Sequence, residues 1–365
     1  MQVSPIKFER YQHSAEDDCQ ERIIAAREKL GKRLVILGHH YQQESVYRHA
    51  DFTGDSLKLS RHAADVDAEY IVFLGVHFMA EVADILSRPD QVVMLPDLAA
   101  GCSMADMANL AKVERSYREL NKVLDFDKEI TPLTYINSAA DLKAFCGEHG
   151  GIVCTSTNAT KMLEWSFAQR EKVLFFPDQN LGRWSGHKMG IPLEQMPVWD
   201  PDQPMGGLTE EQIKNAKILL WKGHCAVHQM FREQNIINFR RDHPEGIVIS
   251  HPEAPYEVCL QSDYVGSTEY ILKTVGAAPS GTHWLVGTEL NLVNRLAEKM
   301  KPEGKVVQFM SHVVCECSTM ARIDPQHLAW TLENLAEGNV VNQIKVLPDE
   351  AKLAKLALDR MLAAS

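Results

Sequence analysis

The chain has 365 residues, of which 45% are hydrophobic and 24% charged, a composition typical of folded globular domains and not of disordered or fibrous chains. Lys and Arg number 38 against 49 Asp and Glu, a net charge of −11 that disfavours nucleic acid or an anionic membrane as a partner. No apolar stretch approaches the roughly 20 residues needed to cross a bilayer, so we expect no membrane span.

The N-terminal sequence and the cysteines indicate a cytoplasmic protein. The first twenty residues mix Lys, Arg, Glu and Asp with few apolar neighbours, so they lack the apolar core of a secretory signal. In a reducing compartment the eight widely spaced cysteines are hard to interpret as a disulfide framework. We therefore expect them to be core thiols or metal ligands.

The first hundred residues alternate between helical and strand patterns. Residues 15–31 have the apolar spacing of an amphipathic helix. The apolar run 34–37 follows, and it is typical of a strand buried on both faces of a parallel sheet. Residues 70–74 and 92–95 are two further predicted strands. Such alternation predicts an α/β fold with a parallel sheet.

The pattern then recurs twice, which predicts a triplicated fold. Each block contains a strand, a turn bearing Ser or Thr, a helix, further strands, and one late cysteine. The turn serines are Ser56, Ser156 and Ser267, and the late cysteines are Cys102, Cys225 and Cys317. We expect three α/β units, at residues 1–118, 119–235 and 236–334, with residues 335–365 helical and packed back on the first unit.

The repeated turns and cysteines each allow two interpretations. A hydroxyl at the start of a helix caps free N–H groups, but several such turns aimed at one point would also bind anions. A lone cysteine is usually an inert buried thiol. Three units meeting at an axis, however, could each give one thiolate to a four-iron cluster, leaving one iron open as a Lewis acid. No C-x-x-C motif supports a closed zinc site.

Three polar clusters adjoin predicted strand ends, where ligands of parallel sheets usually bind. They are His39-His-Tyr41, Tyr135-Ile-Asn137 and His251-Pro-Glu253. Imidazole, phenol and carboxylate groups are the ones an enzyme uses to move protons. His224 and His228, on either side of Cys225, are more typical of core or supporting residues. Neither of the usual glycine-rich nucleotide cradles occurs.

Taken together, the motifs between about residues 34 and 340 resemble the quinolinate synthase family. Each motif alone is unspecific, but eleven occur in the family's order together with three correctly placed cysteines. In the first half they are His39-His-Tyr-Gln42, Gly54-Asp-Ser-Leu57, Phe78-Met-Ala-Glu81, Gly101-Cys-Ser-Met-Ala105, Tyr135-Ile-Asn137 and Thr155-Ser-Thr-Asn158. In the second half they are Pro177-Asp-Gln-Asn-Leu-Gly182, Trp221-Lys-Gly-His-Cys-Ala-Val-His228, His251-Pro-Glu253, Asp263-Tyr-Val-Gly-Ser-Thr268 and Gly287-Thr-Glu289.

The resemblance implies three similar α/β/α units around a pseudo-threefold axis, with the active site at their centre. It implies a [4Fe-4S] cluster on Cys102, Cys225 and Cys317, and an enzyme that condenses iminoaspartate with dihydroxyacetone phosphate to quinolinate, a precursor of NAD. We expect proton transfer by His39, Tyr41, Tyr135 and Glu253. The expected substrate-binding residues are His39, Ser56, Tyr135, Asn137, Ser156, His251, Glu253, Ser267 and Thr268. An L-aspartate oxidase could hand over the iminoaspartate.

The chain departs from the common family pattern at three places. His40 replaces the usual Asn or Tyr, Ala254 replaces a frequent cysteine, and Cys317 is followed by Ser-Thr-Met. None of these changes removes an expected ligand. Cys315 is an alternative ligand or redox partner for Cys317, but the segment 320–323 aligns with the residues that usually follow the ligand, which favours Cys317.

Three rival functions remain open on the sequence alone. The first is a diphthamide-type radical enzyme, which also resembles three units that each donate one cysteine but acts on S-adenosylmethionine; the motifs around His39 and His251 argue against it. The second is a non-catalytic iron–sulfur redox sensor. The third is a zinc-containing or metal-free protein that binds a phosphosugar.

Overall fold

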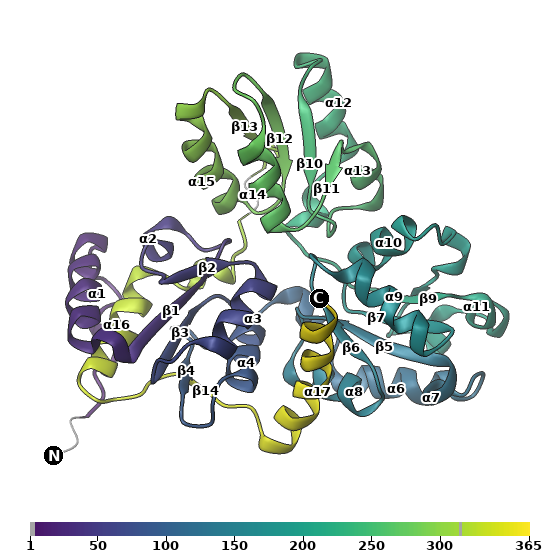
Figure 1. Cartoon of the computed structure of the whole chain (residues 1–365), viewed down its shortest axis with the longest axis horizontal. Coiled ribbons are helices and arrows are strands. Elements are labelled where there is room, and N and C mark those ends of the chain that lie inside the picture. The colour runs from purple at the N-terminus through teal and green to yellow at the C-terminus, as the bar shows by residue number, and fades with distance from the viewer. Residues whose placement is uncertain (1–3, 314–315) are drawn as a thin grey trace. The chain divides into compact units, whose positions relative to one another are not determined.

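The computed structural model describes residues 4–313 and 316–365 (Figure 1). The chain divides into two compact units. Unit 1 contains residues 1–102 and 316–346, and unit 2 contains residues 103–315 and 347–365. One β-sheet lies in unit 1 and two lie in unit 2.

The sheet of unit 1 has the strand order β14-β4-β3-β1-β2. Four of its strands are parallel, and only β14 pairs antiparallel, with β4. The strands are β1 (Leu34–His39), β2 (Phe52–Gly54), β3 (Tyr70–Leu74), β4 (Val92–Met94) and β14 (Gln343–Ile344). The helices are α1 (Glu16–Leu30), α2 (Glu44–Tyr47), α3 (Ser56–Asp65), α4 (His77–Leu86) and α16 (Pro325–Ala336).

The second sheet, in unit 2, has the order β6-β5-β7-β9-β8 and is parallel throughout. Its strands are β5 (Ile130–Tyr135), β6 (Ile152–Cys154), β7 (Lys172–Phe176), β8 (Val198–Trp199) and β9 (Ile218–Trp221). Its helices are α5 (Ser103–Asp106), α6 (Leu110–Leu120), α7 (Phe126–Glu129), α8 (Ala140–Glu148), α9 (Ala159–Gln169), α10 (Gln179–Lys188), α11 (Glu210–Asn215) and α17 (Pro348–Ala364).

The third sheet, also in unit 2, is parallel with the order β11-β10-β12-β13. Its strands are β10 (Ile247–Ser250), β11 (Tyr264–Val265), β12 (His283–Gly287) and β13 (Val306–Phe309). Its helices are α12 (Glu233–Asp242), α13 (Tyr256–Gln261), α14 (Thr268–Ala277) and α15 (Leu290–Met300).

The three sheets share one topology, which confirms the predicted repeat. In each sheet the first strand of the block (β1, β5 or β10) lies between the second (β2, β6 or β11) and the third (β3, β7 or β12). On the far side of the third strand lies β4, β9 or β13. The pairing registers also correspond, since His39 is opposite Gly54, Tyr135 is opposite Cys154 and Ser250 is opposite Val265. In each block the turn serine therefore lies two residues beyond the last paired residue of the second strand.

The strand sequences explain why these sheets form. All residues of β5 and β7 are buried, as expected for parallel strands that helices cover on both faces. The parallel strands of the three sheets fall within residues 1–118, 119–235 and 236–334 respectively. The boundaries of three separate domains and their pseudo-threefold arrangement stay predictions.

The C-terminal region differs from the sequence prediction. Residues 326–363 are not continuously helical, because Gly338 and Asn342 adopt positive φ angles of 84° and 50° and β14 follows them. Part of this region does return to unit 1, but as strand β14 of its sheet and not as a helix, while α17 packs against α8 and β6. Gly147 allows this contact, because a Cβ there would lie 1.9 Å from the carbonyl oxygen of Leu353.

Residues 190–207 contain four prolines but do not form a simple surface loop. They contain β8, which extends the second sheet beside β9, and Trp199 of that strand is buried. Within residues 4–313 and 316–365, no helix has both the length and the apolar character needed to cross a membrane.

Candidate active site

The clearest cluster of chemical groups in unit 2 lies where β5 and β10 end. Tyr135 is the last residue of β5, while His251 and Glu253 follow β10 directly. All three side chains are buried, with exposed fractions of 4%, 2% and 3%. The structure thus brings together residues that lie 118 positions apart in the sequence, as the resemblance implied.

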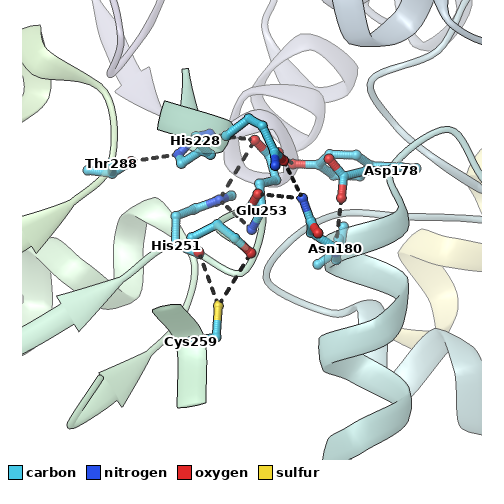
Figure 2. Close-up of polar contacts among 11 residues, drawn as sticks. Asp178, Asn180, His228, His251, Glu253, Cys259 and Thr288 are labelled. Carbon is cyan, nitrogen blue, oxygen red and sulfur yellow. Dashed lines mark hydrogen bonds and ion pairs between the residues drawn. The ribbon is translucent and has the colours of Figure 1, made fainter. Parts of the chain in front are cut away.

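Glu253 is the centre of this cluster (Figure 2). The Tyr135 hydroxyl donates to its Oε1 at 2.6 Å, and Nδ1 of His228 lies 2.8 Å from its Oε2. Nδ1 of His251 is 3.9 Å from the same Oε2. Asn180 donates to the main-chain oxygen of Glu253 at 3.2 Å. The carboxylate is therefore held from two sides, by a phenol and by imidazole.

The charges of the cluster follow from this geometry. Burial alone would raise the pKa of Glu253. The opposite effect is larger and comes from the neighbouring His251 and His228 and from hydrogen bonding to His228 and Tyr135. Together these groups lower the pKa of Glu253 to about 2. Burial lowers the pKa of His251 to about 3. At neutral pH the site therefore holds an ionised Glu253 carboxylate beside a neutral His251.

Other expected binding residues of unit 2 lie at neighbouring turns. Asn137 follows β5, and its Oδ1 is buried with no hydrogen-bond partner in the described part of the chain. Such an atom is a candidate for contact with a ligand. Ser267 caps α14 by accepting from the Tyr270 N–H at 3.4 Å, and Thr268 beside it is buried. Ser156 lies in the half-buried turn after β6.

The remaining expected side chains lie in unit 1. His39 ends β1 and is buried, and its Nδ1 accepts from the Tyr41 N–H at 3.2 Å. The rings of His39 and Tyr41 meet edge to face with centroids 4.7 Å apart. Asp55, and not Ser56, caps α3, by accepting from the Lys58 N–H at 3.0 Å. Capping therefore does not explain the half-buried Ser56 hydroxyl.

Exposure separates the cysteines into two groups. Cys102, Cys225 and Cys317 are each half-buried, and in the chain each follows the last parallel strand of one sheet, β4, β9 or β13. The other cysteines that the structure describes are buried, and burial raises the pKa of each thiol: Cys19, Cys146, Cys154 and Cys259. A raised pKa disfavours the thiolate that a metal requires. The thiols of the three predicted ligands are therefore better suited to bind a metal than those of the buried cysteines. Cys315 lies outside the described residues.

The loop that carries Cys225 is closely attached to the turn after β7. The Gln179 N–H donates to the Gly223 carbonyl at 2.9 Å, and the main-chain N–H of Cys225 faces the Asp178 carboxylate. Gly223 is required there, because a Cβ would lie 2.2 Å from the Pro177 carbonyl oxygen. Ligand atoms of Cys225, His228 and Glu253 lie within 4.8 Å of one another, so this loop combines groups that can hold a metal.

Sequence reasoning missed Asp178, Thr288 and the direct role of His228 in the cluster. Asp178 and Thr288 stand in motifs that were recognised, but nothing in their spacing separated them from capping residues. Burial raises the pKa of Asp178 well above its usual range, and the charge of Glu253 adds to the effect. The sequence predicts that His228 is either a core residue or a residue that supports the site. Its contact with Glu253 favours the supporting role.

Comparison with known proteins agrees with this site. Residues 21–363 match the family model described as Quinolinate synthetase A protein. The chain belongs to the quinolinate synthase family. It is 53% identical to the quinolinate synthase of Acidobacterium capsulatum over 97% of this chain and 95% of that protein. It is 54% identical to that of Rhodopirellula baltica, over 94% and 90% of the two chains. It is 53% identical to that of Herpetosiphon aurantiacus, over 99% and 96%.

Membership of the quinolinate synthase family confirms the resemblance drawn from the motifs. The members named above are synthases, so an enzyme acting on small molecules is favoured over a sensor or a binding protein. The half-buried cysteines are consistent with an iron–sulfur cofactor. Convergence of the three thiols on one cluster stays a prediction, because Cys102 and Cys317 lie in unit 1 and Cys225 in unit 2.

Proposed function

We propose that this chain condenses iminoaspartate with dihydroxyacetone phosphate to give quinolinate, phosphate and two waters, in the biosynthesis of NAD. The family membership supports the reaction. The single structural observation that carries it is the buried Tyr135–Glu253–His251 cluster, because forming an aromatic ring from these substrates requires repeated proton removal and return. We also expect a cytoplasmic location and supply of iminoaspartate by an L-aspartate oxidase.

Glu253 is the proton acceptor in this proposal. Its lowered pKa keeps it ionised, and the 2.6 Å hydrogen bond gives it the Tyr135 proton as its nearest exchange partner. When the phenol oxygen takes a proton from substrate, its own proton can move along this hydrogen bond to Glu253 in the same step, so that no free phenolate forms. His39 and Tyr41 are proposed as the proton-transfer pair of unit 1.

Anion recognition is proposed for the turn residues. Iminoaspartate carries two carboxylates and dihydroxyacetone phosphate carries a phosphate, and such anions bind at helix N-termini and hydroxyl groups. Ser267 and Thr268 stand at the N-terminus of α14, and Ser56 stands at that of α3. Asn137, Ser156 and His251 complete the proposed contacts, and the buried Oδ1 of Asn137 supports its place among them.

The proposed cofactor is a [4Fe-4S] cluster held by Cys102, Cys225 and Cys317. When bound, such a cluster supplies an iron without a protein ligand, which acts as a Lewis acid toward substrate oxygens. The protein's part is to present three half-buried thiols while the other described cysteines stay inside the core. The contacts of Asp178 and Gln179 with the Cys225 loop hold one of these thiols in place.

An anaerobic assay tests the proposed function. Protein purified without oxygen is mixed with dihydroxyacetone phosphate and freshly generated iminoaspartate, and quinolinate and phosphate are measured. Equal amounts of both products are expected. Absence of quinolinate from a protein that carries its iron would refute the proposal, and turnover of S-adenosylmethionine instead would favour the radical enzyme.

A further inference from the structure

His228 occupies a position that neither the motifs nor the proposed reaction explains. It begins a short 3-10 helix, His228–Met230, three residues after Cys225. Its side chain is fully buried, with 0% exposed. A polar ring in such a position requires partners for both nitrogens. Nε2 has a hydroxyl partner, and Nδ1 lies at hydrogen-bonding distance from a carboxylate, although the angle in this structure is not that of a hydrogen bond.

The two ring nitrogens face different elements of unit 2. Nδ1 lies 2.8 Å from Oε2 of Glu253, and Nε2 lies 3.3 Å from the hydroxyl oxygen of Thr288, in the turn after β12 (Figure 2). His228 is therefore fixed at one end by the third sheet and directs its other end at the carboxylate. The ring is buried between Thr288 and Glu253, so a small rotation brings its Nδ1–H into line with the carboxylate.

The two oxygens of Glu253 are consequently occupied by different partners. Oε1 accepts from Tyr135 and Oε2 faces His228, so the plane of the carboxylate is set by both neighbours. Without the contact at Oε2, the carboxylate could rotate and carry Oε1 away from the phenol. A displacement of about 1 Å in a catalytic group can cost a hundredfold in rate.

We propose that His228 is a positioning residue that donates its Nδ1–H to Glu253 and so orients this carboxylate toward Tyr135. The inference rests on the proposed function, because it assigns Glu253 its orientation for that reaction. In this proposal the loop that carries Cys225 also orients the Glu253 carboxylate. The Gln229 N–H donates to the Cys225 carbonyl at 3.0 Å, so one turn carries both the proposed cluster ligand and the residue that orients the base.

Two substitutions separate this role from simple core packing. In His228→Asn the side-chain amide places an N–H close to the position of Nδ1, so the donor to Glu253 is kept. In His228→Leu a side chain of similar breadth fills the space without a donor. Both variants lose the contact with Thr288, which makes the donor to Glu253 the difference between them.

The proposal predicts a specific pattern of kinetics and iron content. In anaerobic assays of quinolinate formation, His228→Leu should lower kcat at least about a hundredfold with KM changed by less than about threefold. His228→Asn should recover at least about tenfold of that loss. Iron per chain should equal that of the unmodified protein in both variants, because His228 is not assigned as a ligand.

Three results would overturn this role. Equal activity of the Asn and Leu variants would show that the donor is unimportant, and wild-type activity of the Leu variant would remove the positioning role altogether. Loss of iron from both variants would make His228 a metal ligand. If the unmodified protein carries iron but forms no quinolinate, the proposed function and this inference fail together, which distinguishes that case from failure of the inference alone.

Discussion

The Tyr135 hydroxyl donates a 2.6 Å hydrogen bond to Oε1 of Glu253, and both side chains are almost completely buried. The two residues come from different sheets of unit 2, so this bond joins the end of β5 to the loop after β10. The pair forms only when both strands are in their native register, and it therefore links the repeat topology to the chemistry proposed here.

Removal of this hydroxyl should abolish most activity and leave the fold intact. In Tyr135→Phe the ring still fills its space, but Glu253 loses one hydrogen bond and the proposed proton carrier is absent. We expect kcat for quinolinate to fall by at least about a hundredfold. The free energy of unfolding should fall by about 1–3 kcal/mol.

Tyr117 provides the matched control for this change. Its hydroxyl also donates to a carboxylate, that of Asp127 at 2.9 Å, but this pair lies outside the cluster of Tyr135, Glu253 and His251. Tyr117→Phe should leave kcat within about twofold of the unmodified protein, since an exposed hydrogen bond contributes little. Equal activity of Tyr135→Phe and Tyr117→Phe would remove Tyr135 from the proposed reaction.

Gly147, the one glycine of helix α8, should tolerate no larger residue. A methyl group at this position would lie 1.9 Å from the Leu353 carbonyl oxygen and would force α17 away from α8. We expect Gly147→Ala to destabilise the protein by about 2 kcal/mol or more, because overpacking typically costs about 1–3 kcal/mol. Chemical denaturation followed by circular dichroism measures this change.

The control for Gly147 is the helical glycine Gly276 of α14. No heavy atom lies within 4 Å of a Cβ built at this position. Gly276→Ala should therefore stabilise the protein by about 0.5–1 kcal/mol, the usual gain from replacing glycine in a helix. If Gly147→Ala is as stable as Gly276→Ala, the contact between α17 and α8 is not as close as described here.

His49 should make the stability of unit 1 sensitive to acid. Burial, together with Arg27 and Arg48, lowers the pKa of His49 from its ordinary value of 6.5 to about 4. Between pH 6.5 and about 4, His49 binds a proton in the unfolded chain but not in the folded chain. The free energy of unfolding that is present at neutral pH therefore decreases as the pH falls. One such group contributes a slope of at most about 1.4 kcal/mol per pH unit.

The variant His49→Gln tests whether His49 causes this acid sensitivity. Glutamine does not titrate, so the slope of unfolding free energy between about pH 6.5 and 4 should decrease. Thermal or urea unfolding at several pH values measures it. An unchanged slope would assign the acid sensitivity to other groups.

Much of the fold could be predicted because the apolar runs are local signals. The run 70–74 coincides with β3 to the residue, and the spacing of Ser56, Ser156 and Ser267 reflects a shared register. The destination of α17 could not be predicted, because it depends on the space beside Gly147, a tertiary contact absent from any periodic pattern.

The site was predictable in part, and for a different reason. Tyr135, His251 and Glu253 were found because strand ends and family motifs coincide there. His228 was expected only as a core or supporting residue, and Asp178 was not singled out. Their roles depend on which buried groups they face, which are Oε2 of Glu253 for His228 and the Cys225 N–H for Asp178. Sequence spacing carries no information about such contacts.

The central claim is that Cys102, Cys225 and Cys317 together hold one iron–sulfur cluster. The most direct test is the iron content and visible absorption of anaerobically purified single alanine variants of these residues, with the buried Cys259→Ala as the control. We predict about four irons per chain in the unmodified protein and in Cys259→Ala, and loss of the cluster from each of the other three. A full complement of iron in any one of those three variants would contradict the claim.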